Sequence, residues 1–234
     1  MANSFIENIS PPKRERLQDH IVSQLKKIIL QGQVDVGEKL PSERDLAQMM
    51  GVSRAVIKQA LISLNNAGFI EIKSGPKGGA FVVEKFHLPV LNTFFDLLEW
   101  GNLTLEHFVQ CRQALEIFIV PILLENIQGH HFIALENINN KVMGALSDKS
   151  LLRKYNMEFH LFLSEIAGNN LITLCLRSLF STLDAFLPES IQEKEFIIST
   201  HKRHEEIIQT LKERDIERCQ ELLIQDVSHT SYLR

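Results

Sequence analysis

The stretch from Leu40 to Leu64, LPSERDLAQMMGVSRAVIKQALISL, constrains the fold of this chain more than any other part of its sequence. It predicts two helices joined by a tight turn at Gly51, because glycine readily adopts the left-handed conformation that ends a helix. Ser42 and Ser53 stand where each helix begins, and serine is a preferred N-cap residue. Small, polar and basic residues occupy the exposed start of the second helix, as in helices that enter the DNA major groove. The sequence therefore predicts a DNA-binding unit.

The apolar residues of the same stretch recur at helical spacing and predict which faces are buried. In the first helix the expected inward residues are Leu46, Met49 and Met50. In the second helix they are Val56, Ile57, Ala60, Leu61 and Leu64. An amphipathic helix from Arg16 to about Gln31 precedes the pair.

Two short alternating segments follow the second helix and predict a hairpin. They are Phe69–Lys73 and Ala80–Val83, joined by the glycine-rich loop 74–79. This loop lacks the Gly-Lys-Ser/Thr ending and the following helix of a nucleotide phosphate site, which leaves an ordinary hairpin turn as the alternative. Its position directly after a recognition helix favours a wing, whose lysines and bare backbone approach the minor groove or the phosphates.

The charge is divided unevenly along the chain. Residues 1–85 carry a net charge of +3 and residues 86–234 a net charge of −7, within an overall −4. The basic excess lies in the half that holds the helix pair, as phosphate contacts require. No apolar run reaches the roughly 18–20 residues that span a bilayer, and no signal pattern opens the chain, so we expect a cytoplasmic protein without a membrane partner.

Residues 84–234 predict almost continuous helices and no convincing strand. The expected helices are Val90–Trp100, Thr104–Ile127, 131–146, 150–167, 170–187, 191–211 and 215–231. Single Trp100 and three widely spaced cysteines are expected to be core residues, without a disulfide framework. We therefore expect a mostly α fold, in which a flexible arm (1–12) precedes a winged helix-turn-helix domain (13–85) and an all-α bundle of six to seven helices (86–234).

Three pairs of polar residues lie three or four positions apart on these expected helices: Asn156 and His160, His201 and His204, and Asp226 and His229. Imidazole and carboxylate groups that converge from facing helices can hold a divalent metal. Each histidine could equally be a surface residue or a hydrogen-bonded core residue.

The segment from Leu17 to Val83 resembles the winged helix-turn-helix head of the GntR family of bacterial transcriptional regulators. The motifs that carry the resemblance are GEKLPSERDLAQMMGVSRAVIKQAL and GFIEIKSGPKGGAFV. The motifs and the resemblance together imply that the following positions lie against DNA: Arg44, Ser53, Arg54, Ala55, Lys58, Gly75 and Lys77. The family usually has Arg-Glu where this chain has Lys58-Gln59, and lysine cannot make the two-point contact of arginine to guanine, so base selection there is expected to be altered or relaxed.

The helical half resembles the FCD effector domain of the FadR-type subfamily, on the motifs CRQALE, YNMEFHLFLSEIAGNNLI and HEEIIQTLKERDIERCQELLIQD. The resemblance implies a metal site in which His160 and His204 match ligand positions. Asn156 stands where Asp is usual, and Asp226 where the last His is usual. Asp226 can still ligate zinc, nickel or manganese, whereas Asn156 is a neutral and weaker donor, with His229 as a substitute one turn from Asp226.

Arg112 of the CRQALE motif has two readings. By the same resemblance it points into the effector cavity, where it would pair with an effector carboxylate through two parallel hydrogen bonds. The alternative is an intrahelical pair with Glu116, worth only about 0.2–0.5 kcal/mol on an exposed helix.

These observations predict a ligand-controlled repressor and not an enzyme. A homodimer would present two recognition helices to a palindromic double-stranded operator, and a small carboxylic acid in the helical domain would change the affinity for DNA. Two alternatives stay open at this stage. One is a metal-dependent enzyme fused to a DNA-binding head, and the other is an architectural DNA binder without a ligand.

Overall fold

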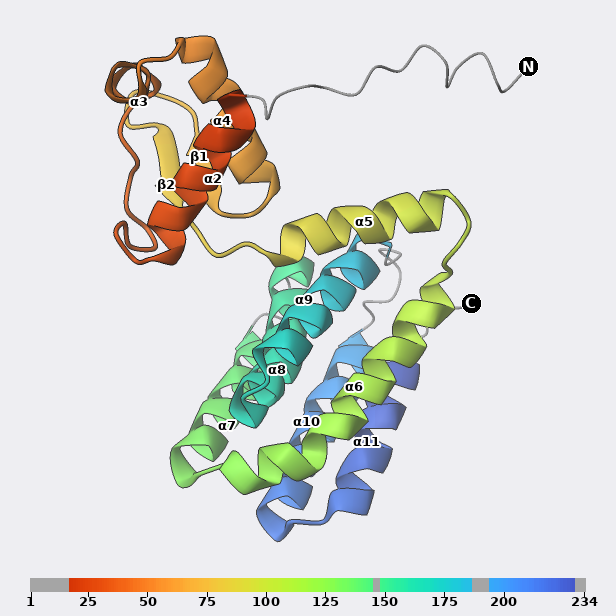
Figure 1. The fold of residues 1–234 in the computed structure, drawn as a ribbon. Coiled ribbons are helices and arrows are strands. Elements are labelled where there is room, and N and C mark those ends of the chain that lie inside the picture. The colour runs from red at the N-terminus through yellow and green to blue at the C-terminus, as the bar shows by residue number, and fades with distance from the viewer. Residues whose placement is uncertain (1–16, 145–147, 187–193, 230–234) are drawn as a thin grey trace, which may run out of the picture. The chain divides into compact units, whose positions relative to one another are not determined.

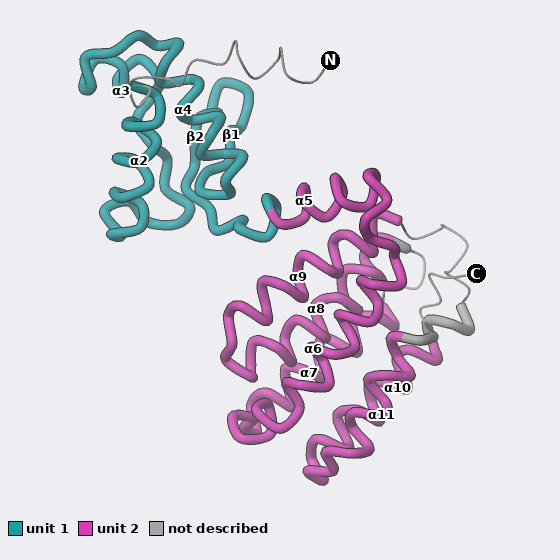
Figure 2. The backbone as a smooth tube through the Cα atoms, turned by 45° about the vertical axis from the view of Figure 1, so that its right-hand side comes forward, with its two compact units in different colours: residues 1–89 teal, residues 90–234 magenta. Residues whose placement is uncertain are grey.

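The structure, a computed structural model, describes residues 17–144, 148–186 and 194–229 of the 234 in the chain. The chain forms two compact units, residues 1–89 and 90–234 (Figure 2). The arm expected at residues 1–12 lies outside the described residues. Each unit has its own hydrophobic core.

The first unit is a winged helix-turn-helix (Figure 1). Its elements are α2 (Leu17–Leu30), α3 (Glu43–Met50), α4 (Arg54–Asn66), β1 (Ile70–Lys73) and β2 (Gly79–Val82). The caps form where the sequence predicts them. The side chains of Ser42 and Ser53 accept hydrogen bonds from backbone N–H groups at the starts of α3 and α4, and Gly51 ends α3 with φ 65°. Local signals therefore fix the geometry of the helix pair.

The core of this unit confirms most of the expected inward faces. Ile57, Ala60, Leu61 and Leu64 of α4 are buried against α2 and the strands. Met49 is an exception, since 73% of it is exposed. The buried positions of α3 are Leu46 and Ala47, and Met50 packs against the same core as expected, whereas Met49 lies on the outer side of the helix.

The wing strands pair antiparallel in the register Ile70↔Val82 to Lys73↔Gly79. A further bridge joins Lys39 to Phe81, in a segment that the sequence assigned to a turn. Backbone hydrogen bonds from Leu40 N to the Ala80 carbonyl, and from Val82 N to the Glu38 carbonyl, hold this segment to β2. The wing is thereby tied to the chain that leads into α3.

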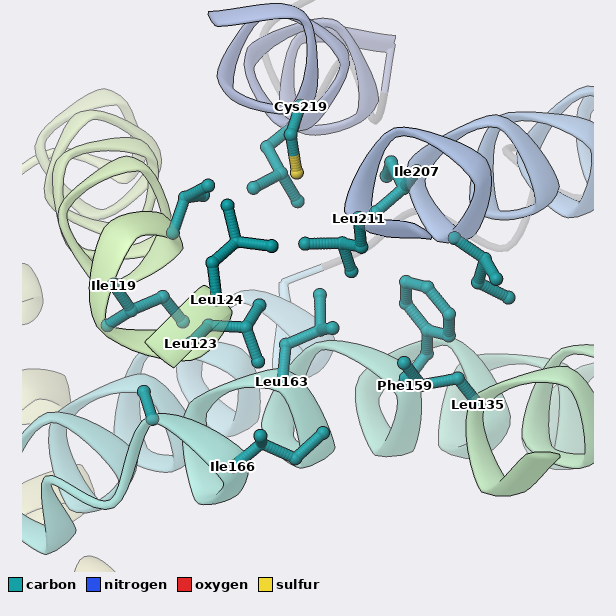
Figure 3. Close-up of a cluster of buried hydrophobic side chains, with 14 of the residues drawn as sticks. Ile119, Leu123, Leu124, Leu135, Phe159, Leu163, Ile166, Ile207, Leu211 and Cys219 are labelled. Carbon is teal, nitrogen blue, oxygen red and sulfur yellow. The ribbon is translucent and has the colours of Figure 1, made fainter. Parts of the chain in front are cut away.

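The second unit is helical throughout its described part. Its helices are α5 (His87–Glu99), α6 (Leu105–Asn126), α7 (Gly129–Gly144), α8 (Lys149–Ala167), α9 (Asn170–Ala185), α10 (Lys194–Glu213) and α11 (Ile216–His229). Helix α5 begins three residues before the division between the units. Asp148 and Asn169 cap α8 and α9, and Gly168 ends α8 in the left-handed conformation. The main core lies where α6, α7, α8, α10 and α11 meet (Figure 3).

Several sequence expectations in this unit were wrong in detail. Helix α5 begins at His87 rather than Val90, and Pro89 lies in its first turn, where a helix needs no N–H donor. Trp100 is 82% exposed, because it follows the last residue of α5 and extends beyond the packed face. Cys111 is exposed, whereas Cys219 is buried as expected.

Helix α6 is long and apolar enough to cross a membrane by length and composition alone. Two of its charged residues, Arg112 and Glu116, are nevertheless buried inside the helical unit. Its residues Ile119, Val120 and Leu123 belong to the main core. These contacts identify α6 as a core helix of the bundle.

Candidate functional site

The start of α4 presents the residues expected to contact DNA. Ser53 caps the helix, and Arg54, Ala55 and Lys58 follow on its solvent-exposed side. All seven positions expected at the DNA surface are exposed: Arg44, Ser53, Arg54, Ala55, Lys58, Gly75 and Lys77. The Arg54 guanidinium lies 3.9 Å from the Glu43 carboxylate, an exposed ion pair that contributes little to stability. The arginine can therefore exchange this partner for a phosphate or a base at small cost.

The wing tip contains two glycines that are needed for different reasons, Gly75 for its positive φ and Gly78 for lack of space. Gly75 has φ 98°, and a Cβ atom on Gly78 would lie 2.3 Å from the Lys73 carbonyl oxygen. The ammonium groups of Lys39 and Lys73 lie 5.8 Å and 4.9 Å from the centre of the Phe81 ring. The wing thus combines a tight backbone turn with positive charge, as contact with a nucleic-acid backbone requires.

A second group of polar residues is buried in the helical unit. Its members come from five helices: Arg112 and Glu116 of α6, Asn139 of α7, His160 of α8, Arg203 and His204 of α10, and Asp226 of α11. All are at most 9% exposed. Burial of this many charged groups is costly unless they are paired, so such a cluster is a functional candidate.

Two histidines and one aspartate form the centre of this cluster. His160, His204 and Asp226 each offer one ligand atom, and these three atoms lie within 4.8 Å of one another. His160 Nε2 is 3.0 Å from Asp226 Oδ2, and the two imidazole rings are 5.2 Å apart. His204 stacks on Phe159 of the main core, with 3.9 Å between ring centres. Side chains from α8, α10 and α11 therefore converge at one point of the helical unit.

Each of these three side chains is held by a neighbour from another helix. His204 Nδ1 donates to Asn139 Oδ1 at 3.2 Å, and Arg203 Nη1 donates to Asp226 Oδ1 at 2.8 Å. His160 Nδ1 lies 3.2 Å from a Glu116 carboxylate oxygen. Outer contacts of this kind orient histidines that bind metals and leave Nε2 as the ligand atom.

His204 Nε2 is buried and has no hydrogen-bond partner among the described residues. Because Asn139 Oδ1 accepts a hydrogen bond from the Nδ1–H group, Nε2 of the neutral ring carries a lone pair that faces the cluster. Two imidazole nitrogens and one carboxylate oxygen are suitable donors for zinc, nickel or manganese. The residues present therefore fit a divalent metal.

The charges of the cluster shift its ionisation equilibria. Burial alone would raise the pKa of Glu116, but Arg112 and His160 outweigh it and hold the pKa below its usual range. Burial opposes ionisation of Asp226 in the same way, and its contacts with His160, His204 and Arg112 hold its pKa far below the usual range. Both carboxylates are therefore ionised at neutral pH.

The two histidines are shifted in opposite directions. Burial lowers the pKa of His204 to about 3, against an upward effect of Asp226, so this ring is neutral at physiological pH. Burial also acts to lower the pKa of His160, but Glu116 and Asp226 outweigh it and the net direction is upward. A neutral His204 is the protonation state that a metal ligand needs.

Arg112 makes the intrahelical pair that the sequence left as an alternative. Its Nε donates to Glu116 Oε1 at 2.8 Å, and both side chains are fully buried. The guanidinium also stacks 4.2 Å above the centre of the Phe180 ring and lies 3.7 Å from Asp226 Oδ2. The pair is therefore part of the polar cluster and not a surface contact.

Other expected site residues lie at the edge of the cluster or outside it. Asn156 is one turn before His160 on α8, and its Oδ1 is buried without a hydrogen-bond partner among the described residues. His201 instead contacts the Asn139 backbone oxygen and Glu205. The side chain of His229 lies outside the described residues.

Sequence reasoning missed Asn139 and Arg203 as members of the cluster. Arg203 directly precedes His204 in the sequence. This neighbourhood was a usable signal that a second charged residue lies beside the histidine. Asn139 lies on α7, on which no polar spacing was recognised. Its role comes from a contact across 65 positions of sequence.

Comparison with known proteins gives two family matches in the chain. Residues 17–82 match the model described as "Bacterial regulatory proteins, gntR family", and residues 107–229 match the FCD domain. The second match alone covers more than half of the chain. It also includes every residue of the buried cluster.

Similar proteins are regulators. An "Uncharacterized HTH-type transcriptional regulator YcbG" of Bacillus subtilis (strain 168) is 27% identical over 205 residues, which cover 86% of this chain and 83% of the relative. The "HTH-type transcriptional repressor NanR" of Enterobacter sp. (strain 638) is 25% identical, with coverages of 88% and 80%. Among solved structures, Streptococcus agalactiae GntR shares the fold with a TM-score of 0.64 at 21% identity, over 91% of this chain and 98% of that one.

Proposed function

Since the chain belongs to the gntR family of bacterial regulatory proteins that carry an FCD domain, and is thus a DNA-binding transcription regulator, we propose that it is a cytoplasmic repressor controlled by a small carboxylate effector. The observation that carries this proposal is the buried cluster of the helical unit. A bundle that served only to join two DNA-binding heads would gain nothing from a cluster of six buried ionisable groups. A ligand site explains them.

The residues that would hold a metal in this site are His160, His204 and Asp226, with Asn156 as a fourth and weaker donor. When bound, the metal supplies open coordination positions that a carboxylate oxygen of the effector can fill. Asn139 and Glu116 keep the two imidazole rings oriented toward the same point.

Arg112 is proposed to contact the effector. Its guanidinium stacks on Phe180 and lies within 3.7 Å of Asp226, so it is fixed beside the cluster centre. An arginine held in this way is preorganised to bind a carboxylate, because little side-chain entropy remains to be lost.

A homodimer is proposed to form through the helical unit. Helix α6 buries one side in the core, yet the middle of its exposed side also carries apolar residues, Ala114, Phe118 and Pro121, of which Phe118 is 60% exposed. A large apolar side chain on the exposed side of a core helix is often covered by a partner. Two copies of the chain would then present two copies of α4 to a palindromic operator at the positions expected to contact DNA: Arg44, Ser53, Arg54, Ala55, Lys58, Gly75 and Lys77.

Regulation follows if the effector binds one dimer geometry more tightly than another. The effector would then shift the population of geometries and change the spacing of the two recognition helices. Relief of repression by the ligand is the proposed direction.

The experiment compares wild-type protein with His204→Ala and with His130→Ala, a matched control at an exposed position of the same unit. An operator is first selected from random duplex DNA, and metal content is measured by elemental mass spectrometry. We expect about one metal per chain in the wild type and the control, and equal operator affinity of all three proteins without ligand. Small carboxylic acids should release the operator only from wild type and control. Equal release from His204→Ala would contradict the site.

A further inference from the structure

The balance of charge in the buried cluster constrains the effector. Two arginines, Arg112 and Arg203, face two carboxylates, Glu116 and Asp226. These four side chains are at most 9% exposed, so water screens them poorly. Among the described residues of the cluster, the two positive charges of the arginines and the two negative charges of the carboxylates therefore cancel before any ligand binds.

A divalent metal changes this balance. Histidines bind a metal in their neutral form, and Asp226 contributes a charge that Arg203 already offsets through its 2.8 Å contact. The loaded cluster would carry two excess positive charges inside the bundle. An uncompensated buried charge is strongly unfavourable, and one carboxylate would remove only half of the excess.

We propose that the effector is a dianion, namely a small dicarboxylate, and that Arg203 sets this preference. The inference rests on the proposed metal and effector site and specifies the charge of its ligand. Arg203 has this role because its positive charge offsets the negative charge of Asp226. It thereby raises the excess positive charge of the metal-loaded cluster from one to two. One carboxylate would lie at the metal, and the second in the field of the two guanidinium groups, of which Arg112 is already fixed over Phe180.

The experiment uses full-length, metal-loaded protein and isothermal titration calorimetry. The probes are malonate, succinate and glutarate, each compared with its own monoamide, which has nearly the same shape and one charge less. Sulfate serves as an inorganic dianion. Metal content is measured after each titration, so that loss of metal by chelation is recognised.

We expect at least one dicarboxylate to bind wild-type protein about tenfold or more tightly than its monoamide. In Arg203→Met the ratio should fall to within about threefold, whereas Arg203→Lys, which keeps the charge, should retain it. The matched control is Arg177→Met, which removes an exposed ion pair to Glu165 and should leave the ratio unchanged.

Equal binding of diacid and monoamide by the wild type would overturn the dianion inference while the carboxylate effector stands. An unchanged ratio in Arg203→Met would overturn the role of Arg203. Sulfate that binds as tightly as the best dicarboxylate would overturn the assignment to an organic diacid. If no acid binds wild-type protein with its metal in place, the carboxylate effector of the proposed function fails as well.

Discussion

Replacement of Glu116 by leucine should destabilise the helical unit strongly. The carboxylate is 1% exposed and lies 2.8 Å from Arg112 Nε and 3.2 Å from His160 Nδ1. Its removal takes the 2.8 Å partner from a buried guanidinium and the acceptor from an imidazole N–H. Removing one partner of a buried ion pair typically costs about 3–5 kcal/mol.

The double variant Arg112→Met/Glu116→Leu should be more stable than Glu116→Leu alone. It no longer contains an uncompensated charge on α6. What remains is the lost contact of His160, which costs about 1–3 kcal/mol, and the lost 3.7 Å contact of Asp226, which keeps His160 and Arg203 as partners. The two substitutions should therefore be strongly non-additive, with a coupling energy of at least about 1 kcal/mol.

Urea unfolding of metal-free protein, followed by circular dichroism, measures these differences through the midpoint and the slope. A leucine substitution at Glu125, an exposed residue of the same helix, controls for the loss of a surface carboxylate. Additive effects of the two substitutions would refute the reasoning, because they would mean that the ion pair does not act as a unit.

Three further predictions follow from single residues. Arg54→Ala should abolish selective operator binding in gel-shift assays without changing the urea midpoint, because its side chain is exposed and packs against no core; an unchanged footprint would argue against the placement of α4. Metal-free protein should lose up to about 1.4 kcal/mol of stability per pH unit as the pH falls below about 6.5. Folding lowers the pKa of His204 to about 3, so in this pH range the unfolded chain binds the proton and the folded chain does not. Urea midpoints at pH 7, 6 and 5 check this slope, and His204→Gln should flatten it. Gly78→Ala should lower DNA affinity and thermal stability together, because the added methyl group would meet the Lys73 carbonyl oxygen; unchanged melting would show that the loop adapts.

The sequence predicted the helix pair well because its signals are local. Ser42 and Ser53 cap the helices that directly follow them, and Gly51 ends α3 through its own backbone conformation. Each of these effects depends on residues no more than one turn away. The bridge between Lys39 and Phe81 was not foreseen, because a pairing of one residue with another 42 positions later has no local pattern.

The candidate metal centre was predicted only in part for the same reason. Spacing on single helices and family resemblance placed His160, His204 and Asp226, and the three side chains do converge. The partners Asn139 and Arg203 belong to contacts between helices, which depend on how the bundle packs. The proposed roles of Asn156 and Arg112 stay predictions.

The separate anchoring of the central side chains also bears on how such a site can evolve. His204 depends on Asn139, His160 on Glu116, and Asp226 on Arg203, so each side chain has its own supporting partner. A substitution of Asp226 on α11 therefore affects Arg203 and the contacts of Asp226 with His160 and Arg112, while the supports from Asn139 and Glu116 stay in place. Modular support of this kind would allow a lineage to exchange one ligand of the centre at a time, and with it the metal or acid that the regulator senses, without passing through an unfolded protein.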